Sequence, residues 1–320
     1  MARLVKHIKS NRSFKRSTGA VFLDLKCAFD SVWHDGLVFK LGTMGFPLWI
    51  LKLIKSFLRD RTFSVCVKDK HSQVLSIPAG VPQGAILSPT LFNLFVSDVP
   101  RPPRNVYLAQ YADDIALYCS SNLPGTIHRN LQAGVNKIVE FCKKWRLKLN
   151  PIKTECVFFS RRINQRYYPN SGMKVQNHES QWKTSAKYLG VTLDKKLTFK
   201  LHVDQIIAKS GICVKSLYSL LHRKSKLHNE NKLLLTVIRP ILMYASSVWG
   251  LCAETHINKI QVTQNRLLKM CLALPRTFPT HVLHEMSNVE PVKVFIARSR
   301  QKFFANCSTS DNTLISSLSP

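Results

Sequence analysis

Residues 110–118 read QYADDIALY, an apolar stretch interrupted by the carboxylates of Asp113 and Asp114. The β-forming residues on both sides predict a β-hairpin whose turn holds the two acids. Residues 20–25, AVFLDL, predict a short buried strand that carries one further acid, Asp24, near its end. The pattern therefore places three carboxylates at the ends of buried strands, where we expect them to share one surface.

Carboxylates in this position suit hard divalent cations. Mg²⁺ takes a few carboxylate oxygens and keeps open positions for water and for phosphates. Two such ions about 3.5–4 Å apart can activate an attacking oxygen and stabilise a leaving phosphate group. An isolated Asp-Asp pair is also common in solvated turns, because Asp is a favoured turn residue. Both interpretations stay open from these residues alone.

The composition describes a folded and strongly basic chain. Its 320 residues are 45% hydrophobic, which is enough for a globular protein of two or three domains. Its 47 Lys and Arg exceed the 18 Asp and Glu, which gives a net charge of +29. This excess predicts a polyanionic partner, with nucleic acid as the leading candidate. There is no apolar run of about 18 residues and no signal-peptide core, so we expect no membrane association.

The cysteine pattern indicates a reducing compartment. Nine cysteines are scattered along the chain, and none forms a C-x-x-C pair. An odd number without paired spacing argues against a disulfide framework and against a zinc site. We therefore expect reduced thiols and an intracellular location, in the nucleus and the cytoplasm.

The chain changes character near residue 195, from mixed strands and helices to helices alone. A polar, basic and aromatic loop is expected over 161–186, and a second, all-α domain is expected from about 196. The expected strands are 62–68, 73–77, 106–111, 115–119, 155–160 and 188–194. The expected helices are 28–45, 49–58, 90–99, 127–145, 203–221, 229–249, 256–274 and 292–306.

Five ordered segments carry a far more specific signal than any one of them. They are FLDLKCAFDSV (22–32), GVPQGAILSPTLFNLF (80–95), QYADDIALY (110–118), WRLKLNPIKTE (145–155) and YLGVTLD (188–194). Together they resemble the palm of a reverse transcriptase of non-LTR retrotransposons of the jockey and LINE type. The later stretch IRPILMYASSVWG (238–250) is similar to the region that such elements carry after the palm.

The resemblance implies an α+β fold: a right-hand polymerase palm with partial fingers, followed by an all-α thumb and C-terminal helices. Family members carry a longer fingers region before the first aspartate, so this chain is expected to begin inside the fingers. The implied domains are partial fingers over 1–19, the palm over 20–195, a helical thumb over 196–250, a C-terminal helical region over 251–306 and a flexible tail over 307–320.

The implied function is that of an RNA-directed DNA polymerase, a nucleotidyltransferase of a mobile element. It would use two Mg²⁺ ions, with Mn²⁺ as a possible substitute, and its partners would be an RNA template, a DNA primer and dNTPs. A different class of function stays open, because the fingers are short in this chain. That alternative is an inactive polymerase-fold remnant that binds RNA or DNA in the manner of a maturase.

The resemblance also implies roles for the residues of the catalytic centre. Asp24, Asp113 and Asp114 match the catalytic metal ligands, with the carbonyl of Leu25 as a fourth ligand. Lys153 matches a lysine that can protonate the leaving pyrophosphate. A solvated lysine after a proline turn is an equally good interpretation of Lys153.

Further positions match the nucleotide site and the primer end. Phe29 matches the ring that excludes a ribose hydroxyl, although a core aromatic is its alternative interpretation. Gln83 and Gly84 match the turn over the incoming nucleotide, and Tyr111 and Ala112 match positions beside the primer terminus.

The remaining matches concern the grip on the nucleic acid. Tyr188, Leu189 and Gly190 match the hairpin that holds the primer backbone. The basic loop of 161–182 and the basic helices of 195–239 are expected to line the template and primer through phosphate contacts. A merely solvated basic face is the alternative for both.

Overall fold

The computed structural model describes residues 1–160, 169, 171–217 and 234–318. The chain forms two compact units, one of residues 11–186 and one that joins residues 1–10 to residues 187–320. The domain limits expected from the sequence stay predictions. Among the described residues, no helix combines the length and the apolar character needed to cross a bilayer.

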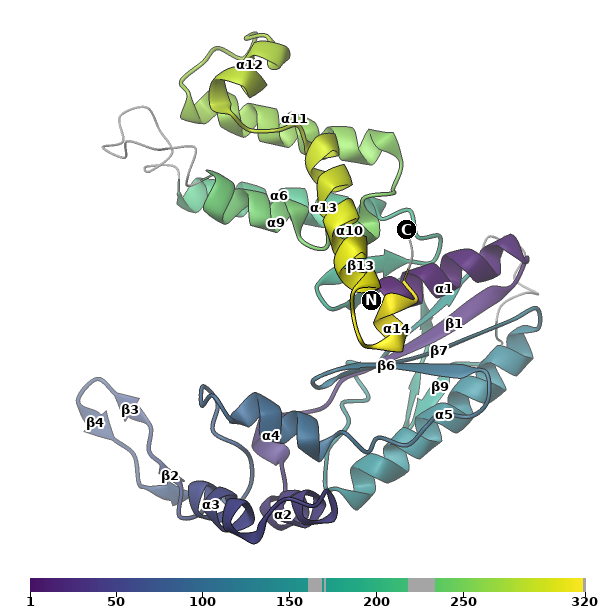
Figure 1. The fold of residues 1–320 in the computed structure, drawn as a ribbon, viewed down its shortest axis with the longest axis vertical. Helices are drawn as coiled ribbons and strands as arrows, with labels where there is room; N and C mark the ends of the chain where they lie inside the picture. The colour runs from purple at the N-terminus through teal and green to yellow at the C-terminus, as the bar shows by residue number, and fades with distance from the viewer. Residues whose placement is uncertain (161–168, 170, 218–233, 319–320) are drawn as a thin grey trace. The chain divides into compact units, whose positions relative to one another are not determined.

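A five-stranded sheet organises residues 11–186 (Figure 1). Its central strand is buried at every position and pairs antiparallel with a neighbour on each side. In spatial order the strands are β11 (Trp182–Lys183), β8 (Glu155–Phe159), β1 (Ser17–Leu23), β7 (Asp114–Ser121) and β6 (Val106–Tyr111). The expected hairpin of QYADDIALY is therefore β6–β7, and the expected strand with Asp24 near its end is β1.

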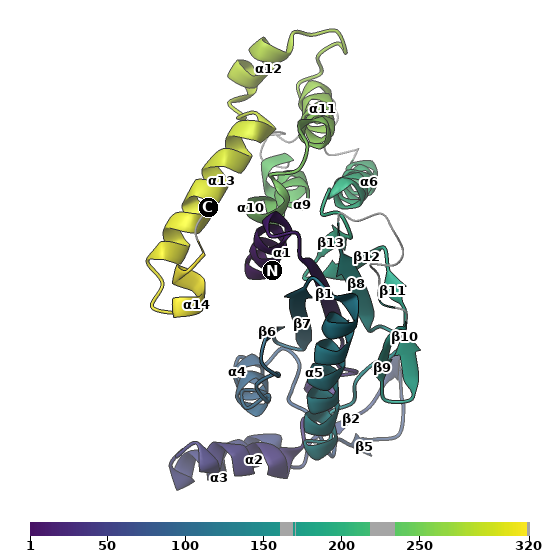
Figure 2. The ribbon, with the colours of Figure 1, turned by 90° about the vertical axis from the view of Figure 1, so that its right-hand side faces the viewer.

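Helix α5 (Pro124–Lys144) covers one face of this sheet, as Figure 2 shows. Ile127, Leu131, Val135 and Ile138 recur at steps of three and four residues and are buried against the strands. The helix predicted from that spacing is confirmed. The short strands β9 (Met173–Val175) and β10 (His178–Ser180) form a separate hairpin beside α5.

Between β1 and β6 the chain forms α2 (His34–Thr43), α3 (Leu48–Leu58) and α4 (Ser88–Phe95). The helix expected over 28–45 begins late, because a 3-10 turn at Phe29–Ser31 and an extended Trp33 precede α2. The strands expected at 62–68 and 73–77 are wrong in length. They form two ladders of two residues, β2 (Thr62–Phe63) with β5 (Leu75–Ser76) and β3 (Cys66–Val67) with β4 (Lys70–His71).

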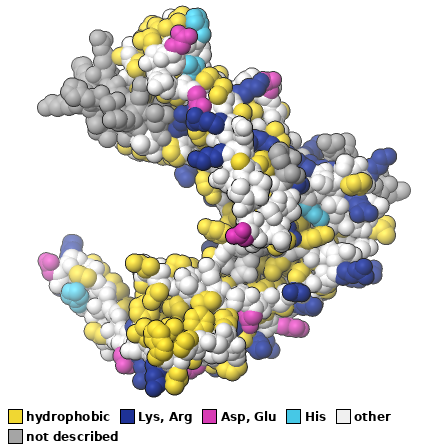
Figure 3. Space-filling view, viewed as in Figure 1, with side chains coloured by type: hydrophobic (Ala, Val, Ile, Leu, Met, Phe, Trp, Pro, Cys, Tyr) yellow, Lys and Arg dark blue, Asp and Glu magenta, His cyan; other side chains and the backbone are white. Residues whose placement is uncertain are grey.

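The outer face of these helices is apolar. Leu48, Trp49 and Leu53 of α3 and Phe39 of α2 have more than half of their surface exposed. Figure 3 shows the hydrophobic side chains gathered over α2, α3 and α4.

Lys40 of α2 is a buried lysine that contacts the end of α4 and the residue that follows α5. Its side chain is 3% exposed, and its ammonium donates to the carbonyl of Phe95 at the end of α4 and to the carboxylate of Asp98. The Nζ atom also lies 3.7 Å from the ring centre of Trp145, just after α5. Burial lowers the pKa of Lys40, while Asp98 opposes that shift. A buried cation is thus held by one acid, one carbonyl and three aromatic rings, those of Phe95, Phe141 and Trp145.

The second unit begins with Met1 and with residues 2–10 of α1 (Ala2–Ser13). The strand expected over 188–194 is wrong, because two strands meet there in a hairpin, β12 (Ser185–Tyr188) and β13 (Val191–Asp194). Leu189 and Gly190 form its turn with φ of 47° and 78°, as the two-residue hairpin turns require. Helix α6 (Lys200–Ser216) follows.

Of the helices expected after residue 233, those over 256–274 and 292–306 are present with slightly different bounds as α11 (Glu254–Cys271) and α13 (Val292–Ser308), and the one over 229–249 is broken. The single helix expected over 229–249 is wrong within the described residues, because Ala245 adopts φ 53° and interrupts it. The segments are a π-helical turn (Leu234–Ile238), α9 (Arg239–Met243), α10 (Ser246–Trp249), α11 (Glu254–Cys271), α12 (Thr280–Ser287), α13 (Val292–Ser308) and α14 (Thr313–Ser316).

The burial of Lys40 leads to a stability prediction. Asp98→Ala should lower the free energy of unfolding by about 2–3 kcal/mol, because it removes the carboxylate that pairs with a buried ammonium. Adding Lys40→Met in the same chain should recover most of that loss, since an apolar side chain needs no counter-ion. Urea unfolding followed by tryptophan fluorescence measures both. Equal losses in the single and the double variant would contradict the role given to Asp98.

Candidate active site

The register of β1 against β7 places the first acid beside the other two. Leu23 of β1 lies opposite Ile115 of β7. Asp24 follows Leu23 and Asp114 precedes Ile115, so the antiparallel pairing brings these two acids to the same end of two adjacent strands. Partners across such a pair have Cα atoms about 4.5–5.5 Å apart.

The third acid lies in the turn of the β6–β7 hairpin. Tyr111 pairs with Asp114, which leaves Ala112 and Asp113 as the connecting residues. Ala112 takes a left-handed φ of 50°, which is an unfavourable conformation for a residue other than glycine. Tyr111 is 69% exposed beside the acids. The turn thus displays Asp113 and Tyr111 at the end of a rigid sheet.

Crowding of the acids has an electrostatic consequence. The pKa of Asp114 is raised, first by burial and then by the negative charges of Asp113 and Asp24. The three side chains are neighbours, but they are not arranged as a complete set of metal ligands. In the described part of the chain, no group of three or more His, Cys, Asp or Glu side chains is arranged to hold a metal ion. The ligand atoms available here are carboxylate oxygens whose negative charges repel one another. Such a set of oxygen ligands fits a hard cation.

A short bridge to residues 148–150 orients the backbone around Asp24. The amide of Asn150 donates to the carbonyl of Asp24 at 2.8 Å, and the amide of Lys26 donates to the carbonyl of Lys148 at 2.7 Å. Leu25 lies between Asp24 and Lys26 and forms a non-hydrogen-bonded antiparallel pair with Leu149. The carbonyl of Leu25 therefore points away from residues 148–150. The Leu25 carbonyl is therefore not engaged by this bridge.

Lys153 lies beside the same acid. Its Nζ atom is 3.8 Å from Oδ2 of Asp24, and its side chain is 70% exposed. An ion pair this open to water adds little stability. The structure thus brings Lys153 to the acids on a side chain that stays free to turn toward a ligand.

The loop of residues 80–84 is joined to the segment that continues from Asp24. The amides of Gly80 and Val81 donate to the carbonyls of Val32 and Phe29, each at 2.8 Å. Gly80 has φ 92°, and a Cβ there would lie 2.7 Å from the Cα of Asp30. Only glycine allows this approach. Gly80 was not predicted as a site residue, although the sequence GVPQG contains the signal.

The predicted nucleotide residues meet at this junction. Gln83 donates from Nε2 to both carboxylate oxygens of Asp30, at 3.0 and 3.2 Å, which the sequence did not predict. Gly84 has φ 92° and open space around it. The ring of Phe29 stacks on Phe92 of α4 with centres 4.7 Å apart. Phe29, Gln83 and Gly84 thus lie on two segments that hydrogen-bond to each other.

The predicted primer-grip residues belong to the other unit. Tyr188 is 3% exposed, so its ring is part of the core. The hydroxyl of Tyr244 donates to the carbonyl of Leu189 at 3.1 Å and supports the turn. Lys209 and Lys215 of α6 are exposed, as phosphate contacts require. The basic residues at 161–166 and at 223 lie outside the described residues.

The sheet is antiparallel except between β11 and β8, and it carries carboxylates at the adjoining ends of β1 and β7, an arrangement that resembles the palm of a polymerase. The family model described as reverse transcriptase (RNA-dependent DNA polymerase) matches residues 2–193, and the chain belongs to that family. The expected family and the expected α+β polymerase fold are confirmed.

Two curated relatives with high coverage of this chain come from mobile elements of flies. The chain is 36% identical, over 94% of its length, to the probable RNA-directed DNA polymerase from transposon BS of Drosophila melanogaster. It is 34% identical, over 82% of its length, to the RNA-directed DNA polymerase from mobile element jockey of Drosophila funebris. It covers 34% and 29% of these two proteins, so it spans about a third of their length.

The raised pKa of Asp114 predicts how stability depends on pH. An acid with a raised pKa binds its proton more tightly in the folded state, so stability falls as pH rises from the unfolded value of 3.8 through the folded value. In metal-free buffer, Asp114→Asn should therefore raise the midpoint of urea unfolding at pH 7, and the gain should disappear near pH 4. Adding Mg²⁺ should stabilise the unchanged chain more than the variant.

The control for this measurement is Asp69→Asn, a change at an exposed acid of the β3–β4 turn. It should leave the pH profile and the response to Mg²⁺ as they are. An Asp114→Asn chain with the same pH profile as the unchanged protein would contradict the crowding of the three acids.

Proposed function

We propose that this chain is the polymerase part of a non-LTR retrotransposon protein and extends a DNA primer on an RNA template. The observation that carries the proposal is the β1–β7 register, which sets Asp24 beside Asp114 at the end of the sheet. Membership of the reverse transcriptase family and the names of the relatives support the same reaction.

Asp24, Asp113 and Asp114 would hold two Mg²⁺ ions, with the Leu25 carbonyl as a further ligand and Mn²⁺ as a substitute. Bound there, the metal ions would activate the primer 3′-oxygen and stabilise the charge on the leaving pyrophosphate. The raised pKa of Asp114 supports this assignment, because a cation relieves the repulsion that raises it.

The residues around the acids would position the substrates. Lys153, within 3.8 Å of Asp24, would donate a proton to the pyrophosphate. Phe29 would close against C2′ of the dNTP sugar. Gln83 and Gly84 would lie over the nucleotide, where Asp30 fixes the Gln83 amide.

The nucleic acid would be held by charge. Exposed lysines such as Lys209 and Lys215 and the net charge of +29 support binding to the phosphates of template and primer. The turn at Leu189–Gly190 would contact the primer backbone, and Tyr111 and Ala112 would lie at its end. All nine cysteines are free thiols, which supports a reducing location inside the cell. The nucleus and the cytoplasm are the proposed compartments.

A primer-extension assay tests the polymerase proposal. With oligo-dT on poly-A template, the chain should incorporate dTTP in Mg²⁺ or Mn²⁺ and not in EDTA. Asp113→Asn should reduce the rate by several orders of magnitude while template binding stays nearly unchanged, because the acid serves the chemical step. The matched control, Asp69→Asn, should keep full activity.

The two functions give different results in this assay. Binding without extension in the unchanged chain would favour the nucleic-acid-binding remnant over the polymerase. Extension by Asp113→Asn at an undiminished rate would contradict the assignment of the metal site.

Phe29 allows a separate test of sugar selection. Phe29→Val should raise the incorporation of ribonucleotides relative to deoxyribonucleotides, because it opens space where the 2′-hydroxyl would lie. Competition between labelled rUTP and dTTP measures the ratio, and urea unfolding measures the loss of the stacking on Phe92. A folded variant with unchanged sugar preference would assign Phe29 to the core alone.

A further inference from the structure

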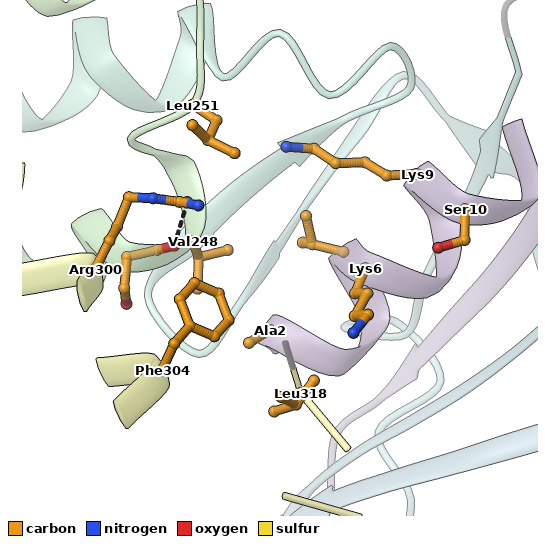
Figure 4. Close-up of a pocket in the computed structure, with 11 residues that line it drawn as sticks. Ala2, Lys6, Lys9, Ser10, Val248, Leu251, Arg300, Phe304 and Leu318 are labelled. Atoms are coloured by element: carbon orange, nitrogen blue, oxygen red, sulfur yellow. Dashed lines mark hydrogen bonds between the residues drawn. The ribbon is translucent and has the colours of Figure 1, made fainter. Parts of the chain in front are cut away.

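A cavity of about 270 Å³ lies within the unit of residues 1–10 and 187–320, outside the candidate active site. It opens between α1, α10 and α13, as Figure 4 shows. Much of its wall is apolar, formed by Ala2, Val5, Val248, Leu251, Phe304 and Leu318. The chain therefore keeps an apolar hollow between segments from its two ends.

Cations surround this hollow. Lys6 and Lys9 reach it from α1 and Arg300 reaches it from α13, while none of the residues that line it is acidic. In Figure 4 the Lys9 side chain extends from α1 toward the wall that carries Arg300. Lys6 donates from Nζ to the carbonyl of Ser317 at 3.2 Å, which closes one side of the rim. An anionic group at the mouth would meet three positive charges.

Arg300 and Phe304 form one wall together. The guanidinium donates to the carbonyl of Ser247 at 3.1 Å, and its carbon lies 5.4 Å from the centre of the Phe304 ring. The Arg300 guanidinium is partly removed from water, and this burial lowers its pKa. A fixed ring and a fixed guanidinium offer both a stacking surface and an anion partner.

The size, the apolar wall and the charge select the class of ligand. A long acyl chain needs more room than 270 Å³, and a free inorganic anion makes no use of an aromatic wall. A nucleotide combines one flat ring system with flanking phosphates. Bases of single strands stack on aromatic side chains while basic residues follow the backbone. A base within a duplex would have to leave its base pair and its stacked neighbours to enter the cavity, so a single strand is the better ligand.

We propose that this cavity binds one unpaired nucleotide of a single-stranded RNA or DNA, with the base against Phe304 and the flanking phosphates at Lys6, Lys9 and Arg300. The inference rests on the proposed function only for the class of ligand. It adds a site for single strands that is built apart from the carboxylates.

Fluorescence of 2-aminopurine tests the proposal. A 12-nucleotide single strand with one central 2-aminopurine, made as RNA and as DNA, is titrated with the full chain in EDTA and without dNTPs. Stacking in the cavity should quench the fluorescence, and the same strand in a duplex should show no further quenching. The RNA and DNA forms show which sugar the site accepts.

Matched variants locate the quenching. Phe304→Ala should weaken the quenched complex by roughly five- to a hundred-fold, the range for loss of one base–aromatic stack. Phe303→Ala, a neighbouring ring of α13 that does not line the cavity, should leave it unchanged. Lys9→Gln should reduce the salt slope of log K by about 0.7, whereas Lys302→Gln should not.

Photocrosslinking is a second test, and it uses the unchanged chain, so its result does not depend on whether a variant folds. A single strand with 5-iodouracil at the central position should crosslink to the peptide of α13 that contains Phe304. Crosslinks found only elsewhere, or equal losses in the Phe304→Ala and Phe303→Ala chains, would overturn the proposal. A chain that fails to extend primers can still pass these tests, and an active polymerase can still fail them.

Discussion

The pairing of β1 with β7 is the constraint on which the candidate active site depends. Every residue of β1 is buried, so a slip of one position would turn its side chains to the opposite face and disrupt packing on both. The core therefore fixes the register, and the register fixes Asp24 against Asp114. The geometry of the acids follows from apolar packing, because the acids themselves repel one another.

The elements whose patterns are local could be predicted from the sequence. The apolar, β-forming runs on both sides of Asp113 and Asp114 predicted the hairpin, and the three- and four-residue steps from Ile127 predicted α5, because both signals lie within a single stretch of sequence. The neighbourhood of Asp24 and Asp113 was expected from chemistry and from a resemblance. Nothing local in the sequence encodes that long-range pairing.

The features missed are those decided by distant partners. Lys40 is an ordinary lysine in HDGLVFKLGT, and only Asp98 and Trp145, remote in sequence, make it a buried cation. Gly80 looks like a plain turn glycine until the backbone of Asp30 lies against it. The break at Ala245 has no glycine or proline at that position, although Pro240 stands at the start of α9, inside the expected helix. The indole of Trp249 donates to the Tyr244 carbonyl across the break at 2.7 Å.

Under the proposed function, charge would separate catalysis from binding in this chain. The three carboxylates would repel the phosphates of template, primer and dNTP, so the acidic end of the sheet would contribute little affinity of its own. Binding would come from the 47 Lys and Arg, which outnumber the acids more than twofold. Salt would therefore weaken binding through the cations, while the acids would control the rate. The cavity with three cations and an aromatic wall lies in the unit that lacks the three acids, so it would also separate nucleic-acid binding from the carboxylates.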